Sequence, residues 1–445
     1  MAHIVIIGNG ISGITCARHV RKAGNDDITV ISAETEHFFA RTALMYIYMG
    51  HMKYEHTKPY EDDFWKKNNI HLVHQYVTGL NVKDSEVLLK DNSKVRYDKL
   101  VIACGSKSNT PDLPGKDLIG VQGLYSYPDL EKMTDVTKNI KHAVIAGGGL
   151  IGIEMAEMLL SKNIHVTMLI REAAYWNSVL PEEDAKLIGR HINEHKIKLI
   201  LNTELTEITG NGNGVVKAVK TKQGEIINCE FVGIAIGVSP NIAFLKDSGI
   251  SMDKGVLVNE YFETNIPNVY AIGDCVQFKE ALPNRKPLEQ IWYTGRMHGE
   301  TLSQTLIGKR TAYKPGPWFN SAKFLDIEYQ TYGDVPAKVK DEEKDFYWEH
   351  ENGKISLRVR YDTGSNIIKG VNTFGMRLRH GVLENWLREN KSIEYALIHL
   401  ADANFDPEFF RTYEQEIIQK YNSEHGKQLK TQRRSWKRLL QILNF

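Results

Sequence analysis

Two segments of the chain share one pattern, which begins with a short apolar run and a glycine-rich turn. In the first segment the apolar run covers residues 4–7 and a second run covers residues 28–32. Continuous runs rich in β-branched residues are typical of buried parallel strands. Between the runs, Ile14, Ala17 and Val20 have the spacing of one helix face. The pattern therefore predicts a strand, a helix and a second strand, in that order.

The turn of the first segment reads Gly8-Asn9-Gly10-Ile11-Ser12-Gly13, which is a GxGxxG motif. The first glycine permits a tight turn, the second lets the backbone approach a pyrophosphate, and the third lets helix and strand pack closely. The helix amino terminus then offers free N–H groups to phosphates. Glu34 lies 21 residues beyond Gly13, where the acid of this motif accepts hydrogen bonds from ribose hydroxyls. We expect a dinucleotide site here rather than an ordinary turn.

The same pattern recurs at residues 142–170, about 139 residues further along the chain. Two such matches arise by chance far less easily than one, because strand, glycine turn, helix and strand must all recur in order. The sequence therefore predicts two dinucleotide sites. The residues expected to bind the second nucleotide are Gly147, Gly149, Leu150, Ile151, Gly152 and Glu154.

Length and charge limit the remaining interpretations. At 445 residues the chain is long enough for about three domains. Its 56 basic and 55 acidic side chains leave a net charge of +1, so no global field favours nucleic acid. No uncharged apolar stretch reaches 18 residues, and the amino terminus lacks the features of a signal peptide. We expect a cytoplasmic protein, or one attached to a membrane only at its surface.

Cysteine is sparse, and no two cysteines form a CxxC pair. This usage indicates a reduced, intracellular protein without a disulfide framework or a cysteine zinc site, and we expect no metal. The four cysteines are Cys16, Cys104, Cys229 and Cys275.

With both loops in place, residues 1–317 resemble the two-dinucleotide-binding-domain flavoproteins. This family includes pyridine nucleotide–disulfide reductases, ferredoxin and rubredoxin reductases, the apoptosis-inducing-factor group and type II NADH dehydrogenases. The resemblance implies FAD at the first loop and NADPH or NADH at the second. Three further segments resemble family motifs: an ATG-like segment at residues 97–105, a GxxPN-like segment at 237–241, and the second FAD motif at 264–274.

These motifs imply individual cofactor contacts. Asp274 matches the aspartate that binds a ribityl hydroxyl of FAD, and Arg41 matches a basic residue placed against the FAD pyrophosphate. Trp292 lies in a segment that packs beside the isoalloxazine ring. A solvated Arg41 and a Trp292 that belongs to the core are the alternatives. The other contacts that the resemblance implies are Ala103, Gly105, Gly237, Gly273 and Gln290.

The resemblance implies that hydride passes from the nicotinamide to N5 of FAD, with Glu154 and Trp292 as the candidate catalytic residues. Glu154 matches a position near the nicotinamide, although a carboxylate on the helix surface is the alternative. Thr42 stands where single-cysteine relatives have their thiol, and no CxxxxC occurs. Because an alcohol cannot act as a thiolate, thiol or peroxide reduction is disfavoured. The open alternatives for the electron acceptor are an iron–sulfur carrier protein, a quinone and oxygen. An alternative function of the chain itself is that of a redox-sensing interaction protein of the apoptosis-inducing-factor type.

The choice between NADH and NADPH depends on the residues after the second strand of the central domain. Arg171 can pair with a 2′-phosphate, whereas Glu172 would repel one. Ile170 stands where the acid of NADH enzymes lies, which favours NADPH.

We therefore predict an α/β fold of the glutathione-reductase type, with two Rossmann-like domains and a carboxyl-terminal α+β domain. The predicted boundaries are 1–112 with 253–317 for FAD, 113–252 for NAD(P)H, 318–426 for an interface domain and 427–445 for a tail helix. Relatives use the interface domain to form homodimers or to dock electron partners. It is expected to hold strands at 323–335, 344–349, 355–361 and 367–374, then helices at 382–389, 393–400 and 408–421.

The tail, residues 427–445, carries six basic residues and no acidic one, with Trp436, Leu440 and Leu443 at helical spacing. A basic amphipathic helix of this kind can lie on a membrane surface or on an acidic partner. The alternative is a terminal helix that packs on its own domain. The six basic residues are Lys427, Lys430, Arg433, Arg434, Lys437 and Arg438.

Overall fold

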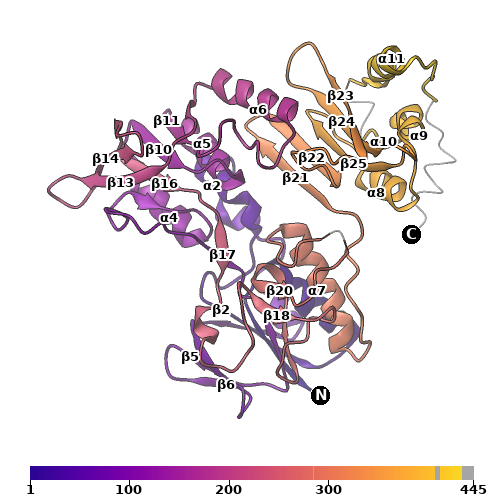
Figure 1. Ribbon diagram of the computed structural model, residues 1–445. Helices are drawn as coiled ribbons and strands as arrows, with labels where there is room; N and C mark the ends of the chain where they lie inside the picture. Colours follow the sequence, from indigo (N-terminus) through magenta and orange to yellow (C-terminus); the bar gives the residue numbers. More distant parts are fainter. Residues whose placement is uncertain (284, 406–410, 433–445) are drawn as a thin grey trace. The chain divides into compact units, whose positions relative to one another are not determined.

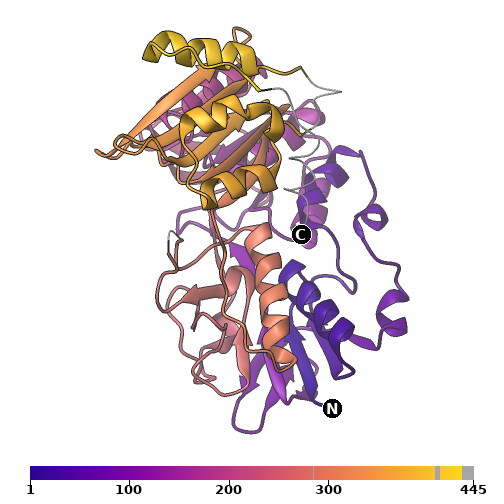
Figure 2. The same ribbon diagram turned by 90° about the vertical axis from the view of Figure 1, so that its right-hand side faces the viewer.

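The computed structural model describes residues 1–283, 285–405 and 411–432. The chain forms two compact units. The first contains Met1–Leu169 and Thr203–Pro315, and the second contains Ile170–Asn202 and Gly316–Phe445. The four domain boundaries predicted from the sequence remain predictions. Figure 1 traces the chain, and Figure 2 shows the view after a quarter turn.

A five-stranded parallel sheet contains the first predicted strand–helix–strand pattern. Its order is β19-β7-β1-β2-β3, and every neighbouring pair is parallel. Helix α1 (Ile11–Ala23) packs against α7 (Trp292–Leu306). The strands are β1 (His3–Ile7), β2 (Asp27–Ser32), β3 (Ile70–His74), β7 (Lys99–Ile102) and β19 (Val269–Ala271).

The second predicted pattern forms a second parallel sheet in the first unit. Within this unit its order is β11-β10-β16-β9, with helix α5 (Leu150–Ser161) between β10 and β11 in sequence. Both predicted patterns are therefore confirmed as β-α-β units. The strands are β9 (Val121–Gln122), β10 (His142–Ala146), β11 (His165–Leu169) and β16 (Phe231–Ile234).

Smaller elements complete the first unit. Antiparallel β8 (Ser106–Ser108) and β17 (Val238–Pro240) pair where the chain passes between the two larger sheets. Strands β18 (Val256–Val258) and β20 (Val276–Phe278) form a parallel pair. Two antiparallel sheets contain β4 (Val77–Asn81), β5 (Glu86–Leu89) and β6 (Lys94–Arg96), and β13 (Leu205–Gly210), β14 (Val216–Thr221) and β15 (Ile226–Asn228). The helices include α2 (Leu44–Met49), α3 (Phe64–Lys67) and α4 (Tyr127–Val136).

The second unit contains an antiparallel sheet with helices, as the predicted α+β class requires. Its order is β21-β22-β25-β24-β23. The strands are β21 (Phe319–Phe324), β22 (Ile327–Gly333), β23 (Glu343–Glu349), β24 (Ser356–Asp362) and β25 (Ile368–Phe374). The helices are α6 (Glu182–Glu194), α8 (His380–Arg388), α9 (Ile393–Ile398), α10 (Leu400–Ala403) and α11 (Glu414–His425), and the short strand β12 (Lys198–Ile200) follows α6.

Strand β24 shows how the two faces of this sheet differ. Leu357, Val359 and Tyr361 point into an apolar core that α8, α9 and α11 help to build. Arg358 and Arg360 alternate with them and are also buried, so their charges need partners. Arg358 donates to Asp184 of α6 over 2.9 Å and to Asp345 of β23 over 2.7 Å. Buried ion pairs therefore fix the amino-terminal part of α6 within this unit.

Two local predictions for this unit need correction. The single strand expected at residues 323–335 is wrong, because a two-residue turn at Leu325 and Asp326 separates β21 from β22. The expected tail helix does not begin at residue 427, since α11 ends before Gly426, whose φ is +61°, and residues 427–432 are not helical. Leu429 instead packs against the apolar core of the second unit. The remainder of the predicted tail helix, residues 433–445, lies outside the described residues.

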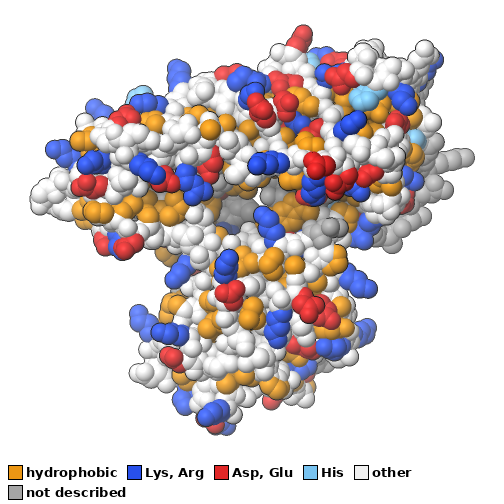
Figure 3. All heavy atoms as spheres, viewed as in Figure 1, with side chains coloured by type: hydrophobic (Ala, Val, Ile, Leu, Met, Phe, Trp, Pro, Cys, Tyr) orange, Lys and Arg blue, Asp and Glu red, His pale blue; other side chains and the backbone are white. Residues whose placement is uncertain are grey.

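Charge is distributed without a dominant sign on the face shown in Figure 3, where basic and acidic side chains are interspersed. In the part of the chain that the structure describes, no helix is both long enough and apolar enough to cross a bilayer.

Candidate cofactor-binding site

The two glycine loops adopt nearly the same backbone geometry. Gly8 and Gly147 have φ values of +114° and +112°, a region that favours glycine. A Cβ on Gly8 would lie 2.1 Å from the carbonyl oxygen of Ala103, and a Cβ on Gly147 would lie 2.2 Å from that of Ala235. The first glycine of each loop is therefore required for two reasons: its φ is positive, and a side chain would clash with the backbone at the end of a neighbouring strand.

The second and third glycines of each loop differ in how much space surrounds them, as the motif predicts. A Cβ on Gly13 would meet the Gly8 oxygen at 2.1 Å, and one on Gly152 would meet the Gly147 oxygen at 2.5 Å. In contrast, a Cβ on Gly10 or Gly149 would point into open space. The third glycine thus serves close packing, whereas the second leaves room beside the backbone for another molecule.

The helices that follow these loops begin without side-chain caps. Gly10 and Gly149 are the N-cap residues of α1 and α5, and neither helix start has a capping side-chain hydrogen bond. Free N–H groups and the positive end of a helix dipole favour a bound anion. Both loops therefore fit the pyrophosphate of a dinucleotide.

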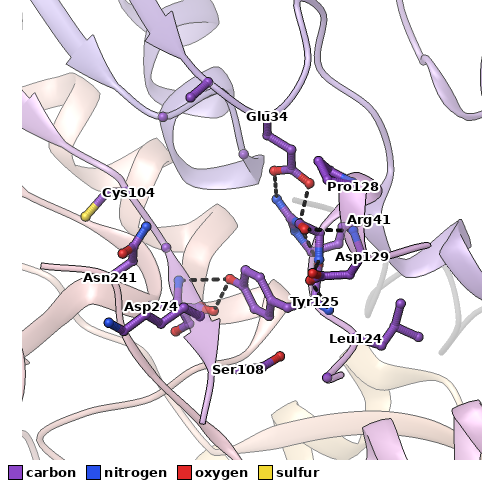
Figure 4. Close-up of a pocket in the computed structure, with 18 of the residues that line it drawn as sticks. Glu34, Arg41, Cys104, Ser108, Leu124, Tyr125, Pro128, Asp129, Asn241 and Asp274 are labelled. Atoms are coloured by element: carbon purple, nitrogen blue, oxygen red, sulfur yellow. Dashed lines mark hydrogen bonds and ion pairs between the residues drawn. The ribbon is translucent and has the colours of Figure 1, made fainter. Parts of the chain in front are cut away.

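A pocket of about 1010 Å³ lies in the first unit and collects most of the predicted site residues. Its volume is at the upper end of the range for small-molecule sites, about 300–1,000 Å³. Figure 4 shows part of its lining. The predicted residues that line it are Gly8, Gly10, Ser12, Glu34, Arg41, Ala103, Gly105, Ile151, Glu154, Gly273, Asp274, Gln290 and Trp292.

Other predicted residues do not line this pocket. Arg171 belongs to the second unit, where its side chain is 74% exposed and lies 3.3 Å from the carboxylate of Glu172. Gly237 has a φ of +98° and accepts a hydrogen bond from the amide of Asn109, so it anchors the β17 strand beside β8. The remaining ones are Gly13, Gly147, Gly149, Leu150 and Gly152, which belong to the two glycine motifs.

An ion pair between Glu34 and Arg41 lies in the pocket wall. The Arg41 guanidinium donates to both carboxylate oxygens of Glu34, over 2.8 and 2.5 Å, and to the carbonyl oxygen of Tyr125 over 2.6 Å. The amide of Tyr127 also donates to Glu34. Arg41 is thus not a freely solvated surface residue, and Figure 4 shows its guanidinium against Glu34. Arg41 and the first nucleotide loop line the same pocket.

Asp274 is held by residues that the sequence reasoning missed. Its carboxylate accepts a hydrogen bond from the Tyr125 hydroxyl over 3.1 Å, and that hydroxyl accepts one from the amide of Ser106 over 3.0 Å. Burial raises the pKa of Asp274, while the Tyr125 hydrogen bond and the Arg41 charge oppose that rise. No motif marks Tyr125, since its partner lies 149 residues away in the sequence.

A hydrogen bond from helix α7 holds the backbone of Gly273 in place. Its amide donates to Nδ1 of His298 in α7 over 3.1 Å, so that nitrogen must be an acceptor and the ring is neutral. Burial lowers the pKa of His298 to about 3. At the start of the same helix, Trp292 lines the pocket and is only partly buried, and Gln290 donates to Ser106. The geometry thus favours the pocket over the core for Trp292.

Glu154 contributes the one acidic side chain that α5 brings to the pocket lining. Burial, together with the charge of Glu157 one turn further on, raises the pKa of Glu154 to about 7. The carboxyl group therefore changes its charge near neutral pH. This behaviour differs from that of an ordinary carboxylate on a helix surface.

Three of the four cysteines have thiols whose pKa is raised, which disfavours a reactive thiolate. All four are free thiols, and burial raises the pKa of Cys16 and Cys229 to about 12. Cys104 lines the pocket, and its contact with Cys275 together with burial raises its pKa well above the ordinary value. Thr42, which stands in place of a family thiol, also lines the pocket.

The fold has two glycine loops, each followed by an uncapped helix start, and residues next to both loops line one pocket. These features define a protein that binds two dinucleotides. The family model described as pyridine nucleotide-disulphide oxidoreductase matches residues 2–299, and the chain belongs to this family. The α/β fold class and the assignment of FAD with NADH or NADPH are thereby confirmed.

Individual relatives agree with this placement. The chain is 30% identical over 344 residues to the NADH-rubredoxin oxidoreductase of Clostridium acetobutylicum, covering 76% of this chain and 84% of the relative. The solved structure of the NADH:rubredoxin oxidoreductase from that organism matches with a TM-score of 0.68 and 26% identity, covering 88% of this chain and 96% of the other. A nitrite reductase [NAD(P)H] of Bacillus subtilis is 27% identical over 279 residues, which is 62% of this chain but only 34% of that protein.

Proposed function

We propose that the chain is an FAD-dependent oxidoreductase that takes hydride from NAD(P)H and passes the electrons to an iron–sulfur carrier protein. The observation that carries this proposal is the shared pocket. Its lining includes the first glycine loop and Asp274, together with Ile151 and Glu154 of the helix that follows the second loop. A redox ring from each nucleotide can meet only if both sites open into the same space.

When bound, FAD supplies two-electron hydride acceptance from the nicotinamide and one-electron release to a carrier. The contribution of the chain is to bind and orient. The uncapped starts of α1 and α5 bind the two pyrophosphates, and Glu34 accepts hydrogen bonds from ribose hydroxyls. Asp274, oriented by Tyr125, accepts from a ribityl hydroxyl. The Arg41 charge offsets that of the nearby phosphates.

Glu154 is proposed to lie beside the nicotinamide ring. Loss of hydride leaves a positive charge on that ring, and an ionised carboxylate within the pocket stabilises such a charge. Because the pKa of Glu154 is about 7, this stabilisation increases as the pH rises through neutrality. Trp292, at the start of α7, is proposed to pack beside the flavin ring.

The carrier-protein acceptor is supported by named relatives. The chain covers most of an NADH-rubredoxin oxidoreductase and 80% of a nitric oxide reductase FlRd-NAD(+) reductase of Shigella dysenteriae. Rubredoxin-type acceptors carry one electron on iron, which suits a flavin that collects two electrons at once. Thiol or peroxide reduction would need a thiolate, and Thr42 cannot supply one.

The test is a reoxidation screen. Protein reduced anaerobically with NADH or NADPH is mixed with rubredoxin, a [2Fe–2S] ferredoxin, a short-chain quinone and oxygen, and the return of flavin absorbance is followed. We expect the iron–sulfur proteins to reoxidise the flavin fastest. Faster reoxidation by quinone or oxygen, or the appearance of reducible thiols beyond the flavin equivalents, would contradict the proposed acceptor.

The nucleotide preference is proposed to be NADPH. Arg171 is exposed and paired only loosely with Glu172, so it remains available for a 2′-phosphate. Arg171→Ala is expected to weaken NADPH binding about tenfold and to leave NADH binding nearly unchanged, a difference of about 1.4 kcal/mol. Glu172→Gln, which removes the neighbouring negative charge, should shift the preference toward NADPH. Equal losses for both nucleotides in the Arg171 variant would contradict the assignment.

Surface attachment of residues 427–445 and homodimer formation are further proposals, which rest on the basic tail and on the interface domain of relatives. Flotation with anionic vesicles compares the full chain with a chain that ends at residue 426. We expect only the full chain to float, and equal behaviour of the two would exclude the membrane role. Sedimentation of the same two proteins reports whether a dimer forms.

A further inference from the structure

Two histidines and a carboxylate meet in the second unit, among residues that the cofactor pocket does not use. His191 lies in α6, His195 is its C-cap residue one turn later, and Asp326 lies in the turn between β21 and β22. Oδ1 of Asp326 is 2.5 Å from Nε2 of His191 and 3.3 Å from Nε2 of His195. One ligand atom from each residue lies within 4.8 Å of the other two.

The elements that carry these side chains are held in place independently of them. The Asp184–Arg358 ion pair fixes the amino-terminal part of α6. On the hairpin, Phe324 packs edge-on against Trp176, with 5.1 Å between ring centroids, and Leu325 is buried. Asp326 is therefore presented on an anchored two-residue turn.

The ring of His195 places an electron-rich nitrogen close to the Asp326 carboxylate. Its Nδ1 lies 3.0 Å from the backbone oxygen of His191, and because a carbonyl can only accept, Nδ1 must carry the hydrogen. In the neutral ring Nε2 then carries a lone pair, and this atom lies 3.3 Å from Oδ1 of Asp326. A lone pair and a carboxylate oxygen this close repel each other, and a proton or a metal ion bound near both atoms removes that repulsion.

His191 has the same arrangement in a more buried place. Its side chain is 1% exposed, and neither ring nitrogen makes a hydrogen bond of good geometry. Behind the ring, Nδ1 lies 3.6 Å from a carboxylate oxygen of Glu194, which pairs with Lys354. A histidine with a carboxylate or carbonyl on its second nitrogen is the usual orientation of a metal ligand.

We propose that His191, His195 and Asp326 bind a divalent transition-metal ion, with Zn²⁺ as the best match. Two imidazoles and one carboxylate are a ligand set typical of zinc. Bond lengths near 2.0–2.1 Å place tetrahedral ligand atoms about 3.3 Å apart, which is the His195–Asp326 separation. The His191–Asp326 contact would lengthen. Asp326 is 61% exposed, so water can reach a fourth position.

The ion would join the end of α6 to the β21–β22 hairpin. These ligands are distant in sequence, since His195 and Asp326 are separated by 131 positions. Because only the folded chain brings these ligands together, the ion would bind the folded state and stabilise the second unit. The inference does not depend on the proposed oxidoreductase function, because it uses neither the pocket nor its residues.

The test uses the full-length, FAD-loaded protein with its affinity tag removed and metals stripped by chelation. Calorimetric titration with Zn²⁺ at pH 7.5 should show one high-affinity site per chain, and saturation should raise Tm. Asp326→Asn and His195→Gln are each expected to weaken zinc binding at least about tenfold and to abolish the Tm increase. Both variants should keep their FAD and the far-UV circular dichroism of the wild type, which together show that both units are folded.

The matched control is His425→Gln. His425 makes the same hydrogen bond from Nδ1 to a backbone oxygen one turn back, that of Tyr421, but its Nε2 lies near the Tyr361 hydroxyl rather than a carboxylate. Its zinc affinity should equal that of the wild type. Absence of a site of 1:1 stoichiometry, or equal affinity in the Asp326→Asn variant, would overturn the proposal and leave a proton between Asp326 and the two rings.

Discussion

Arg41 and Glu34 form a two-pronged ion pair in the wall of the cofactor pocket, with N–O distances of 2.8 and 2.5 Å. Their side chains are 29% and 18% exposed. Such a pair holds both groups in fixed orientation before any ligand arrives. The carboxylate proposed to bind the FAD ribose is thus positioned by the cation proposed to face the FAD phosphates.

Replacing Arg41 should therefore weaken FAD binding in two ways. In Arg41→Met the phosphates lose a cation, and Glu34 is left as a poorly solvated carboxylate without its partner. We expect the FAD dissociation constant to rise at least tenfold, or about 1.4 kcal/mol, in a fluorescence titration of the apoprotein.

The control for this change is Arg310→Met. Arg310 forms a similar two-pronged pair with Glu263, at 2.9 and 2.8 Å, and neither residue lines the pocket. Its FAD affinity should match that of the wild type. Equal FAD affinities of the wild type, Arg41→Met and Arg310→Met would show that Arg41 does not contribute to FAD binding.

Gly147→Ala should impair the NAD(P)H site and leave the FAD site intact. The added Cβ would lie 2.2 Å from the Ala235 oxygen at a φ of +112°, so the second loop must move. We expect the variant to bind FAD normally but to require at least about tenfold more NAD(P)H for half-maximal flavin reduction. Gly212→Ala, at a position where a Cβ meets nothing, serves as the control. Loss of FAD instead of nucleotide affinity would reverse the assignment of the loops.

Ionisation of Glu154 should appear in the pH profile of flavin reduction. Below a pH of about 7 the carboxyl is neutral, and above it the carboxylate stabilises the developing nicotinamide charge. The wild-type rate constant should rise through pH 7, whereas Glu154→Gln should stay at the low-pH value. Glu157→Gln removes a charge that raises the pKa of Glu154, so its inflection should move to lower pH. An unchanged profile in Glu154→Gln would show that another group titrates.

The buried neutral His298 should make the first unit sensitive to acid. Its pKa is about 3 in the folded protein against 6.5 as an ordinary value, so the unfolded chain binds the extra proton between these limits. The stability that depends on a neutral His298 is therefore fully present above pH 6.5 and is lost as the pH falls toward 3. Between pH 7 and pH 5 this histidine alone should cost about 2 kcal/mol of unfolding free energy.

Denaturant unfolding at the two pH values measures this loss. His298→Gln retains an acceptor for the Gly273 amide but cannot take up a proton. The loss between pH 7 and pH 5 should be smaller in this variant by about the same 2 kcal/mol. Equal losses would mean that His298 is not neutral in the folded chain.

Patterns in the sequence predicted the parts of the fold that depend on residues close together in the chain. Both β-α-β units follow from glycine spacing and apolar runs, and both loops have the predicted glycine geometry. Tyr125 could not be predicted in this way, because its role depends on Asp274, which only the folded chain brings near. No local signal in the sequence distinguishes this tyrosine from others.

The β21–β22 turn escaped prediction for a different reason. Two-residue hairpin turns are usually recognised by glycine or asparagine at positive φ, but here Leu325 has a φ of +58°. The sequence therefore looks like one long strand, and the proximity of Asp326 to His191 and His195 could not be anticipated. The buried side chain of Leu325 helps to compensate for the unfavourable dihedral angle.

The central claim is that two dinucleotides bind so that hydride passes between them in one pocket. Anaerobic stopped-flow mixing of FAD-loaded protein with NADH or NADPH tests it directly. We predict rapid loss of the oxidised flavin absorbance near 450 nm, complete at one equivalent of nucleotide per FAD. A protein that takes up no FAD, or a bound flavin that neither nucleotide reduces, would contradict the account.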